Sequence, residues 1–144
     1  MKLVLDTNVI LAALFSRNGL SNKLLVWLFE QHDKFNVVSN PLVTELEDVL
    51  TRDKNLDKYI NLSKEDVESF IDDICLISYK QNINFLWRPF LKDRNDDMVL
   101  EVAFNSNSNS IITYNKKDFS GVKEHFNIDV LTPKEFLIQI GELK

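Results

Sequence analysis

The sequence predicts an α/β fold, a three-layer α/β/α sandwich built on a central, mainly parallel sheet. Short apolar runs alternate along the chain with helical segments, as in βαβ units. The first run, Lys2 to Asp6, is apolar without alternation, which is typical of a parallel strand covered on both faces. The length of 144 residues suits one domain, so we expect a single domain spanning residues 1–144.

The expected strands are short and rich in Val, Ile and Leu. They are Lys2 to Asp6, Phe35 to Ser39, Ser110 to Tyr114 and Ile128 to Leu131. A further short strand is expected at Ile83 to Trp87, within an otherwise irregular stretch from Asn82 to Lys92. The polar run Asn105 to Ser110 predicts a solvated loop.

The expected helices have apolar residues at helical spacing and a polar residue suited to capping at the start. Their start signals are Ser21, Asn40 followed by Pro41, Ser63 with Asp66, Asp93 to Asp97, and Thr132 followed by Pro133. Val9 to Phe15 is also expected to be helical, directly after the first strand.

Cysteine content, hydropathy and net charge indicate the cellular compartment and restrict the classes of function. Cys75 is the only cysteine, so an intramolecular disulfide is excluded, and a small core residue is expected there. Asp6 interrupts the apolar start of the chain, and no apolar run approaches the length of a membrane span. A cytoplasmic protein is therefore expected. The net charge of −5 argues against a simple nucleic-acid-binding module, but less against a nuclease whose acids are neutralised by a metal ion.

Carboxylates follow several of the predicted strands. Asp6 ends the first strand, Glu45 lies on the helix after the second, and Asp118 follows the Ser110–Tyr114 strand. A further group, Asp93, Asp96 and Asp97, begins the helix before that strand. Ligands bind beyond the carboxyl ends of parallel strands, and oxygen-only ligands suit Mg²⁺ or Mn²⁺. Such a site favours hydrolysis of phosphodiester bonds.

Each acid also has a structural explanation. Asp6 can cap the following helix, Asp96 and Asp97 can favour a helix N-terminus, and Asp118 can cap a turn. Helical periodicity alone does not decide between Glu45 and Glu47. A phosphotransferase with Asp6 as the nucleophile would need a second aspartate two residues later, where this chain has Asn8.

Several segments resemble the PIN-domain family, in the same order along nearly the whole chain. Leu3 to Val9, with Asp-Thr-Asn after an apolar strand, resembles the first motif, and Ser39 to Leu46 the second. Asp93 to Ala103 resembles the third-acid motif of the VapC-like toxin branch, and Ile111 to Phe119 the fourth motif. Leu131 to Leu137 resembles the C-terminal signature of that branch.

The resemblance implies a Mg²⁺- or Mn²⁺-dependent endoribonuclease, often dimeric and often the toxin of a type II toxin–antitoxin pair. It marks as catalytic acids Asp6, Glu45, Asp96 and Asp118, of which Asp6, Asp96 and Asp118 are the metal ligands. Supporting roles fall to Asn8, Asp93, Asp97, Thr113 and Asn115. Substrate contacts are expected from Lys116, Lys117 and Arg94.

One residue departs from the pattern. Many relatives have an aspartate two residues after the threonine, where this chain has Asn115. Asparagine offers an oxygen without charge, which weakens the case for a second metal ion. A PIN-like scaffold that binds a protein or RNA partner without cleaving it is therefore the alternative.

The stretch from Tyr79 to Arg94 combines cations with aromatic residues. The cations are Lys80, Arg88, Lys92 and Arg94, and the aromatic residues are Tyr79, Phe85, Trp87 and Phe90. Three interpretations remain open: contacts to single-stranded RNA, aromatic residues in the core with solvated cations, and a surface for a second subunit or an antitoxin.

Overall fold

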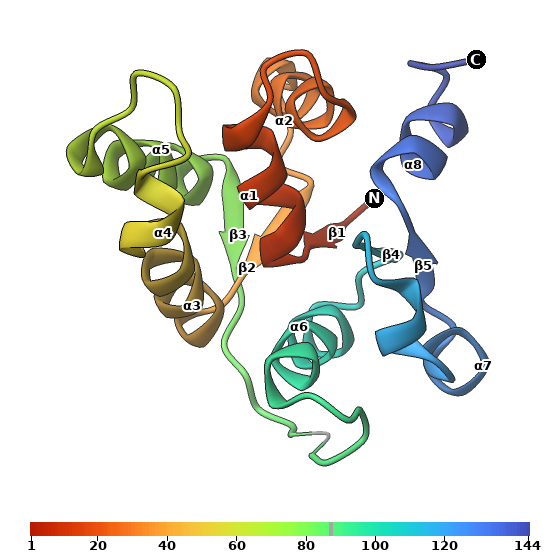
Figure 1. Ribbon diagram of the computed structural model, residues 1–144. Helices are drawn as coiled ribbons and strands as arrows, with labels where there is room; N and C mark the ends of the chain where they lie inside the picture. Colours follow the sequence, from red (N-terminus) through yellow and green to blue (C-terminus); the bar gives the residue numbers. More distant parts are fainter. Residues whose placement is uncertain (87) are drawn as a thin grey trace.

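The computed structural model describes residues 1–86 and 88–144, and its centre is a five-stranded sheet (Figure 1). The strands are β1 (Leu3–Leu5), β2 (Asn36–Val38), β3 (Ser78–Lys80), β4 (Ser110–Ile112) and β5 (Asp129–Leu131). All described strand pairs are parallel, and the order across the sheet is β3-β2-β1-β4-β5. From β1 the chain builds the sheet first toward β2 and later toward β4. The strand order therefore reverses beside β1, and a crevice is expected at its carboxyl end.

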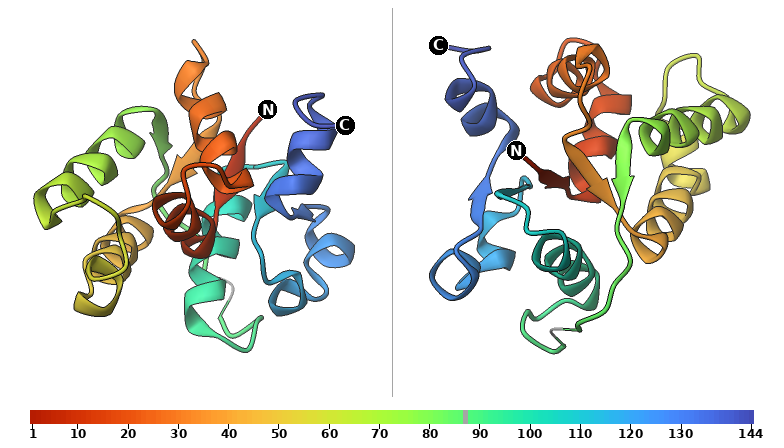
Figure 2. Two further views of the ribbon diagram at one scale, coloured as in Figure 1. Left: turned by 45° about the horizontal axis from the view of Figure 1, so that its top comes forward. Right: turned by 180° about the vertical axis from the view of Figure 1, so that it is seen from behind.

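Helices cover both faces of the sheet. They are α1 (Thr7–Phe15), α2 (Leu20–Glu30), α3 (Asn40–Leu50), α4 (Asp53–Leu56), α5 (Lys64–Leu76), α6 (Arg94–Asn105), α7 (Val122–Phe126), α8 (Pro133–Gln139) and the 3₁₀ helix η1 (Lys116–Phe119). Figures 1 and 2 show α1, α2, α5 and α8 on one side of the sheet, and α6 and α7 on the other. This is the α/β/α sandwich that the sequence predicted.

Alternate side chains of β1 pack into two hydrophobic cores, one on each face of the sheet. Leu3 and Leu5 pack into the core beneath α1, α2, α5 and α8, whereas Val4 packs into the core beneath α6 and α7. All three side chains are almost fully buried. This explains why the first apolar run does not alternate with polar residues.

Local hydrogen bonds confirm most helix starts. Ser63 and Thr132 each form a reciprocal capping box with the acidic residue three positions later. At α3 the cap is shifted by one residue, because the Ser39 hydroxyl accepts from the backbone N–H of Leu42. The predicted cap at Ser21 was wrong: α2 begins at Leu20, and the Ser21 hydroxyl forms a hydrogen bond with that of Tyr114.

Other predictions required correction. No strand is described over residues 83–86, and Trp87 lies outside the described residues; the strand on that side of the sheet is β3. The run from Asn105 to Ser110 is not a solvated loop, because Asn105 ends α6 and Ser106, Ser108 and Ser110 are buried. Cys75 is only partly buried and packs at the margin of the larger core.

No helix within residues 1–86 and 88–144 combines the length and the apolar character needed to cross a membrane.

Candidate active site

Asp6 lies at the carboxyl end of β1, where β1 pairs with β4. The register places Leu5 opposite Ile112, and the backbone N–H of Asp6 donates to the Ile112 carbonyl at 2.9 Å. The Thr113 hydroxyl donates to Asp6 Oδ2 at 2.8 Å. Asp6 occupies the N-cap position of α1, but its side chain makes no capping hydrogen bond there. The Asp6 carboxylate is thus directed to β4, which argues against a purely capping role.

Burial raises the pKa of Asp6, whose side chain has little contact with solvent. The hydrogen bond from Thr113 lowers the pKa, and the nearby carboxylates of Asp118 and Asp93 raise it further. A buried carboxylate with acidic neighbours favours either a proton or a cation.

Thr113 is the centre of a hydrogen-bond network around Asp6. Besides donating to Asp6, its hydroxyl oxygen accepts from Asn8 Nδ2 at 3.4 Å and from the backbone N–H of Asn115 at 3.0 Å. Asn8 Oδ1 in turn accepts from the backbone N–H of Tyr114 at 3.4 Å. The network fixes the Thr113 hydroxyl and with it the orientation of the Asp6 carboxylate.

Glu45 faces the same crevice from α3. Its Oε2 accepts a hydrogen bond from the hydroxyl of Thr7 at 3.1 Å, and Thr7 directly follows Asp6 in the sequence. Glu45 is partly buried, whereas Glu47 is exposed. Burial raises the pKa of Glu45, the Thr7 hydroxyl lowers it, and the Asp6 and Asp93 carboxylates raise it. The structure therefore distinguishes two glutamates that helical periodicity could not separate.

Asp96, in the first turn of α6, interacts electrostatically with all the other acids of the crevice. Its pKa is raised from 3.8 to about 7, most by burial and then by Asp6, Asp93, Asp118 and Glu45 in that order. Five carboxylates from four chain segments thus act on one another across the carboxyl edge of the sheet.

Asp97 has a different position from its neighbour. It is buried, and its Oδ1 accepts from the backbone N–H groups of Phe90 and Leu91, at 3.3 and 2.9 Å. Its carboxylate therefore holds the segment before α6. The structure thus places Asp97 against the loop before α6, and it is not among the carboxylates that raise the pKa of Asp96.

A cavity of about 500 Å³ opens beside the acids. It is lined by Phe90, Leu91, Lys92, Asp93, Asp96, Lys117, Asp118 and Ser120. Of the three cations expected to contact substrate, Lys117 lines this cavity, Lys116 pairs with Glu135 at 3.0 Å, and Arg94 is exposed at the start of α6. Lys92, one of the cations noted in the Tyr79–Arg94 stretch, also lines the cavity. Sequence reasoning missed Ser120 at the cavity and Thr7 beside Glu45; Thr7 belongs to the Asp-Thr-Asn motif, which was its only signal.

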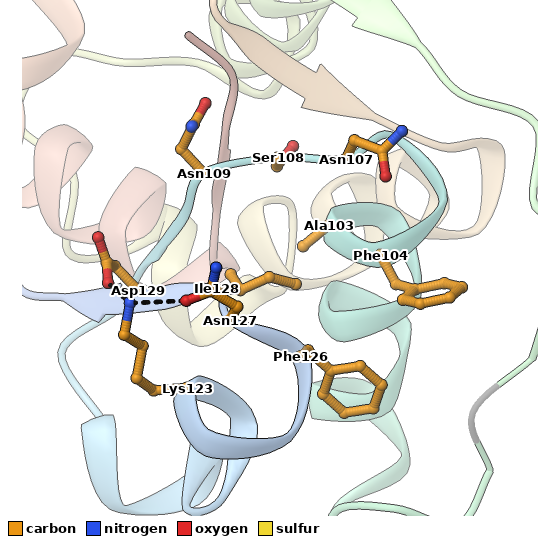
Figure 3. Close-up of a pocket in the computed structure, with 10 residues that line it drawn as sticks. All are labelled: Ala103, Phe104, Asn107, Ser108, Asn109, Lys123, Phe126, Asn127, Ile128 and Asp129. Atoms are coloured by element: carbon orange, nitrogen blue, oxygen red, sulfur yellow. Dashed lines mark hydrogen bonds and ion pairs between the residues drawn. The ribbon is translucent and has the colours of Figure 1, made fainter.

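A second cavity, of about 410 Å³, lies at the opposite edge of the sheet, before β4 and β5 (Figure 3). Amide and hydroxyl side chains share its lining with apolar ones. Lys123 is paired there with Asp129 at 2.6 Å and with Asn127 Oδ1 at 3.2 Å. With a single acidic residue in its lining, already paired, this cavity offers no comparable metal site.

The family model for the PIN domain matches residues 2–117. The chain belongs to the PIN-domain family. An uncharacterized protein of Methanocaldococcus jannaschii is 26% identical over 148 residues, which cover 95% of this chain and 90% of that protein. The crystal structure of VapBC2 from Rickettsia felis, bound to a DNA fragment from its promoter, contains a chain of the same fold. That chain aligns with a TM-score of 0.59 at 18% identity, covering 92% of this PIN domain and 98% of its own length.

The donor set of this PIN domain fits a hard dication in charge and chemistry. The potential ligands are all carboxylate oxygens, and burial, followed by repulsion from neighbouring carboxylates, raises the pKa of Asp6, Glu45 and Asp96. Within the described part of the chain, however, no three acidic, cysteine or histidine side chains are arranged to enclose an ion directly. Mg²⁺ commonly keeps several water ligands and binds through one or two carboxylates, which suits this open arrangement.

Proposed function

We propose that this PIN-domain protein is a Mg²⁺- or Mn²⁺-dependent endoribonuclease. The observation that carries the proposal is the placement of four acids that are far apart in the sequence at one edge of the sheet. Asp6 is hydrogen-bonded to Thr113, Glu45 is hydrogen-bonded to the adjacent Thr7, and Asp96 and Asp118 line one cavity. Such a cluster attracts a hard cation, and the cation supplies charge neutralisation for a phosphate together with an activated water. The proposed metal ligands are Asp6, Asp96 and Asp118, which would hold the ion partly through bound water.

The side chains of the protein have separable roles in this proposal. Thr113 orients the Asp6 carboxylate, and Thr7 orients that of Glu45. Asp96, with a pKa of about 7, is about half protonated near neutral pH, and a bound cation would displace that proton. Lys117, at the rim of the acidic cavity, is suited to contact a phosphate of the substrate strand.

The proposed partners follow from the resemblance to VapC-like toxins and from the fold shared with a chain of the Rickettsia felis complex. We propose a cognate antitoxin, a homodimer and a cytoplasmic location, with RNA as the substrate. The toxin role requires that binding of the antitoxin suppress RNA cleavage.

A second candidate is a PIN scaffold that binds a protein or RNA partner without cleaving RNA. The observation that favours it is Asn115, an uncharged residue at a position where many relatives have an aspartate. In the structure the backbone N–H of Asn115 donates a hydrogen bond to the Thr113 hydroxyl, but the Asn115 side chain brings no charge to the acid cluster.

Cleavage of single-stranded RNA, with and without Mn²⁺, separates the two candidates. We expect cleavage only with Mn²⁺, and loss of at least about 100-fold in kcat for Asp6→Asn. Asp48→Asn is the matched control, because Asp48 is an exposed acid paired with Arg52 on the surface of α3. Metal-independent cleavage, or full activity of Asp6→Asn, would refute the enzyme proposal, and complete inactivity of the wild type would favour the scaffold.

A further inference from the structure

The segment before α6, residues 84–86 and 88–91, forms hydrogen bonds and an ion pair with that helix at three successive turns. Asp97, Glu101 and Asn105 are spaced four residues apart and therefore lie along one face of α6. Asp97 accepts from the backbone of Phe90 and Leu91, and Glu101 forms a bidentate ion pair with Arg88 at 2.9 to 3.1 Å. This face of α6 thus sets the path of residues 84–86 and 88–91.

The Asn105 side chain forms hydrogen bonds with the backbone of Asn84 and Phe85. Its Oδ1 accepts from the backbone N–H groups of Asn84 and Phe85, at 3.2 and 3.1 Å. Its Nδ2 donates to the Phe85 carbonyl at 2.9 Å and to the Glu101 carbonyl at 2.8 Å. One side chain therefore fixes both backbone polar groups of Phe85.

The Phe85 ring is held in place and yet faces solvent. It leans against Phe104 with ring centroids 5.7 Å apart, but 51% of the residue is exposed. About half of the residue therefore remains accessible to a ligand on a backbone that Asn105 holds. A rigid, exposed aromatic ring is suited to stacking against a nucleobase, because little conformational entropy is lost on binding.

The place of Phe85 relative to the acids follows from the geometry of α6. Asn105 lies nine residues after Asp96 on one continuous helix, which corresponds to roughly 14 Å. Each nucleotide of a stacked strand advances about 3.4 Å along the strand axis, so this span corresponds to about four stacked nucleotides. The other end of the same segment, at Phe90 and Leu91, lines the acidic cavity. The segment thus leads from Phe85 to the proposed reaction centre.

We propose that Phe85 is a substrate-binding residue on which a base of single-stranded RNA stacks, several nucleotides from the scissile phosphate, and that Asn105 is its positioning residue. The proposal rests on the proposed ribonuclease function and adds the path of the substrate. It also selects among the three interpretations of the aromatic stretch: Phe85 contacts RNA, whereas Arg88 serves to hold the segment through Glu101.

Steady-state kinetics with two substrates tests this path. The substrates are a single-stranded RNA of about ten nucleotides, which can reach Phe85, and a dinucleotide, which cannot. We expect Phe85→Leu to raise KM for the long RNA roughly tenfold, with kcat within about twofold, and to leave the dinucleotide kinetics unchanged. Phe85→Tyr should behave as wild type, because it retains the ring. Asn105→Ala should raise KM for the long RNA as Phe85→Leu does.

Two matched controls exclude a general effect on the fold. Phe29→Leu removes another exposed ring, on α2, and Asn22→Ala removes another amide that donates to a backbone carbonyl. Both should retain the wild-type KM. An unchanged KM in Phe85→Leu, or an equal rise for both substrates, would overturn the inference while leaving the ribonuclease proposal intact.

Inactivity of the wild type on both substrates would instead refute the ribonuclease proposal. Fluorescence anisotropy with the same long RNA then decides whether Phe85 contacts RNA. Binding that weakens roughly tenfold in Phe85→Leu retains Phe85 as an RNA contact, and absence of binding by the wild type overturns that role as well.

Discussion

Replacing Asp96 with asparagine removes the carboxylate whose ionisation is most strongly opposed by its surroundings. Its pKa is raised from 3.8 to about 7, first by burial and then by four neighbouring carboxylates. The folded protein therefore binds this proton more tightly than the unfolded chain does. The free energy of unfolding contributed by Asp96 is highest below about pH 4 and falls as the pH rises to about 7.

The size of the effect follows from the pKa difference. A difference of about three pH units corresponds to an upper limit of about 4 kcal/mol at alkaline pH. Asp96 is only partly buried, so solvent screens its repulsion, and we expect about 1–2 kcal/mol. Without metal at about pH 8, Asp96→Asn should therefore be more stable than wild type by that amount, a rise in Tm of roughly 3–6 °C.

Thermal unfolding at about pH 4 and pH 8, with and without Mn²⁺, measures this directly. At the acidic pH the two proteins should have nearly equal stability, because folded Asp96 is protonated and its repulsion with the other acids is absent. Mn²⁺ should reverse the order at the alkaline pH, since it stabilises the wild type by about 2.7 kcal/mol at 100 times its Kd and the variant much less.

Asp97→Asn is the matched control for this substitution. It removes the same charge one residue away, but the Asp97 carboxylate accepts two backbone hydrogen bonds that stabilise the fold. We expect a loss of about 1 kcal/mol, with or without Mn²⁺. Destabilisation of Asp96→Asn at the alkaline pH without metal would refute the inferred repulsion among the acids, and an unaltered wild-type Tm in millimolar Mn²⁺ would refute the metal site.

Two further substitutions test the roles of individual groups. Glu45→Gln should lower kcat for RNA by at least about 100-fold, whereas Glu47→Gln, on the exposed side of α3, should leave kcat unchanged; equal kinetics of the two variants would contradict the assignment. Thr113→Val removes the hydroxyl that lowers the pKa of Asp6, so calorimetry at neutral pH should show roughly tenfold weaker Mn²⁺ binding, and Thr113→Ser should restore it. Unchanged Mn²⁺ affinity in Thr113→Val would show that this hydroxyl does not tune the site.

The sequence predicted the features that depend on local patterns. The fold class followed from alternating strands and helices, and the position of Asp6 followed from the end of an apolar strand. Helix caps at Ser63 and Thr132 followed from residues three positions apart. Each of these signals lies within a few residues, so tertiary packing does not alter it.

The features that depend on tertiary contacts could not be predicted in this way. Asp96 and Asp97 are adjacent in the sequence, and only the packing of α6 directs one to the acids and the other to the backbone of Phe90 and Leu91. The three-residue strand β3 has two exposed residues and little apolar pattern. Residues 83–86 are mainly apolar, as in a short strand, but the backbone of Asn84 and Phe85 is held by Asn105 of α6.

The most direct test of the central claim, that folding gathers these acids into a site for a hard dication, is a crystal soaked in Mn²⁺ and measured for anomalous scattering. The account predicts a peak bounded by the carboxylates of Asp6, Asp96 and Asp118. A well-diffracting crystal with no peak there, or with Mn²⁺ only at remote surface acids, would contradict it.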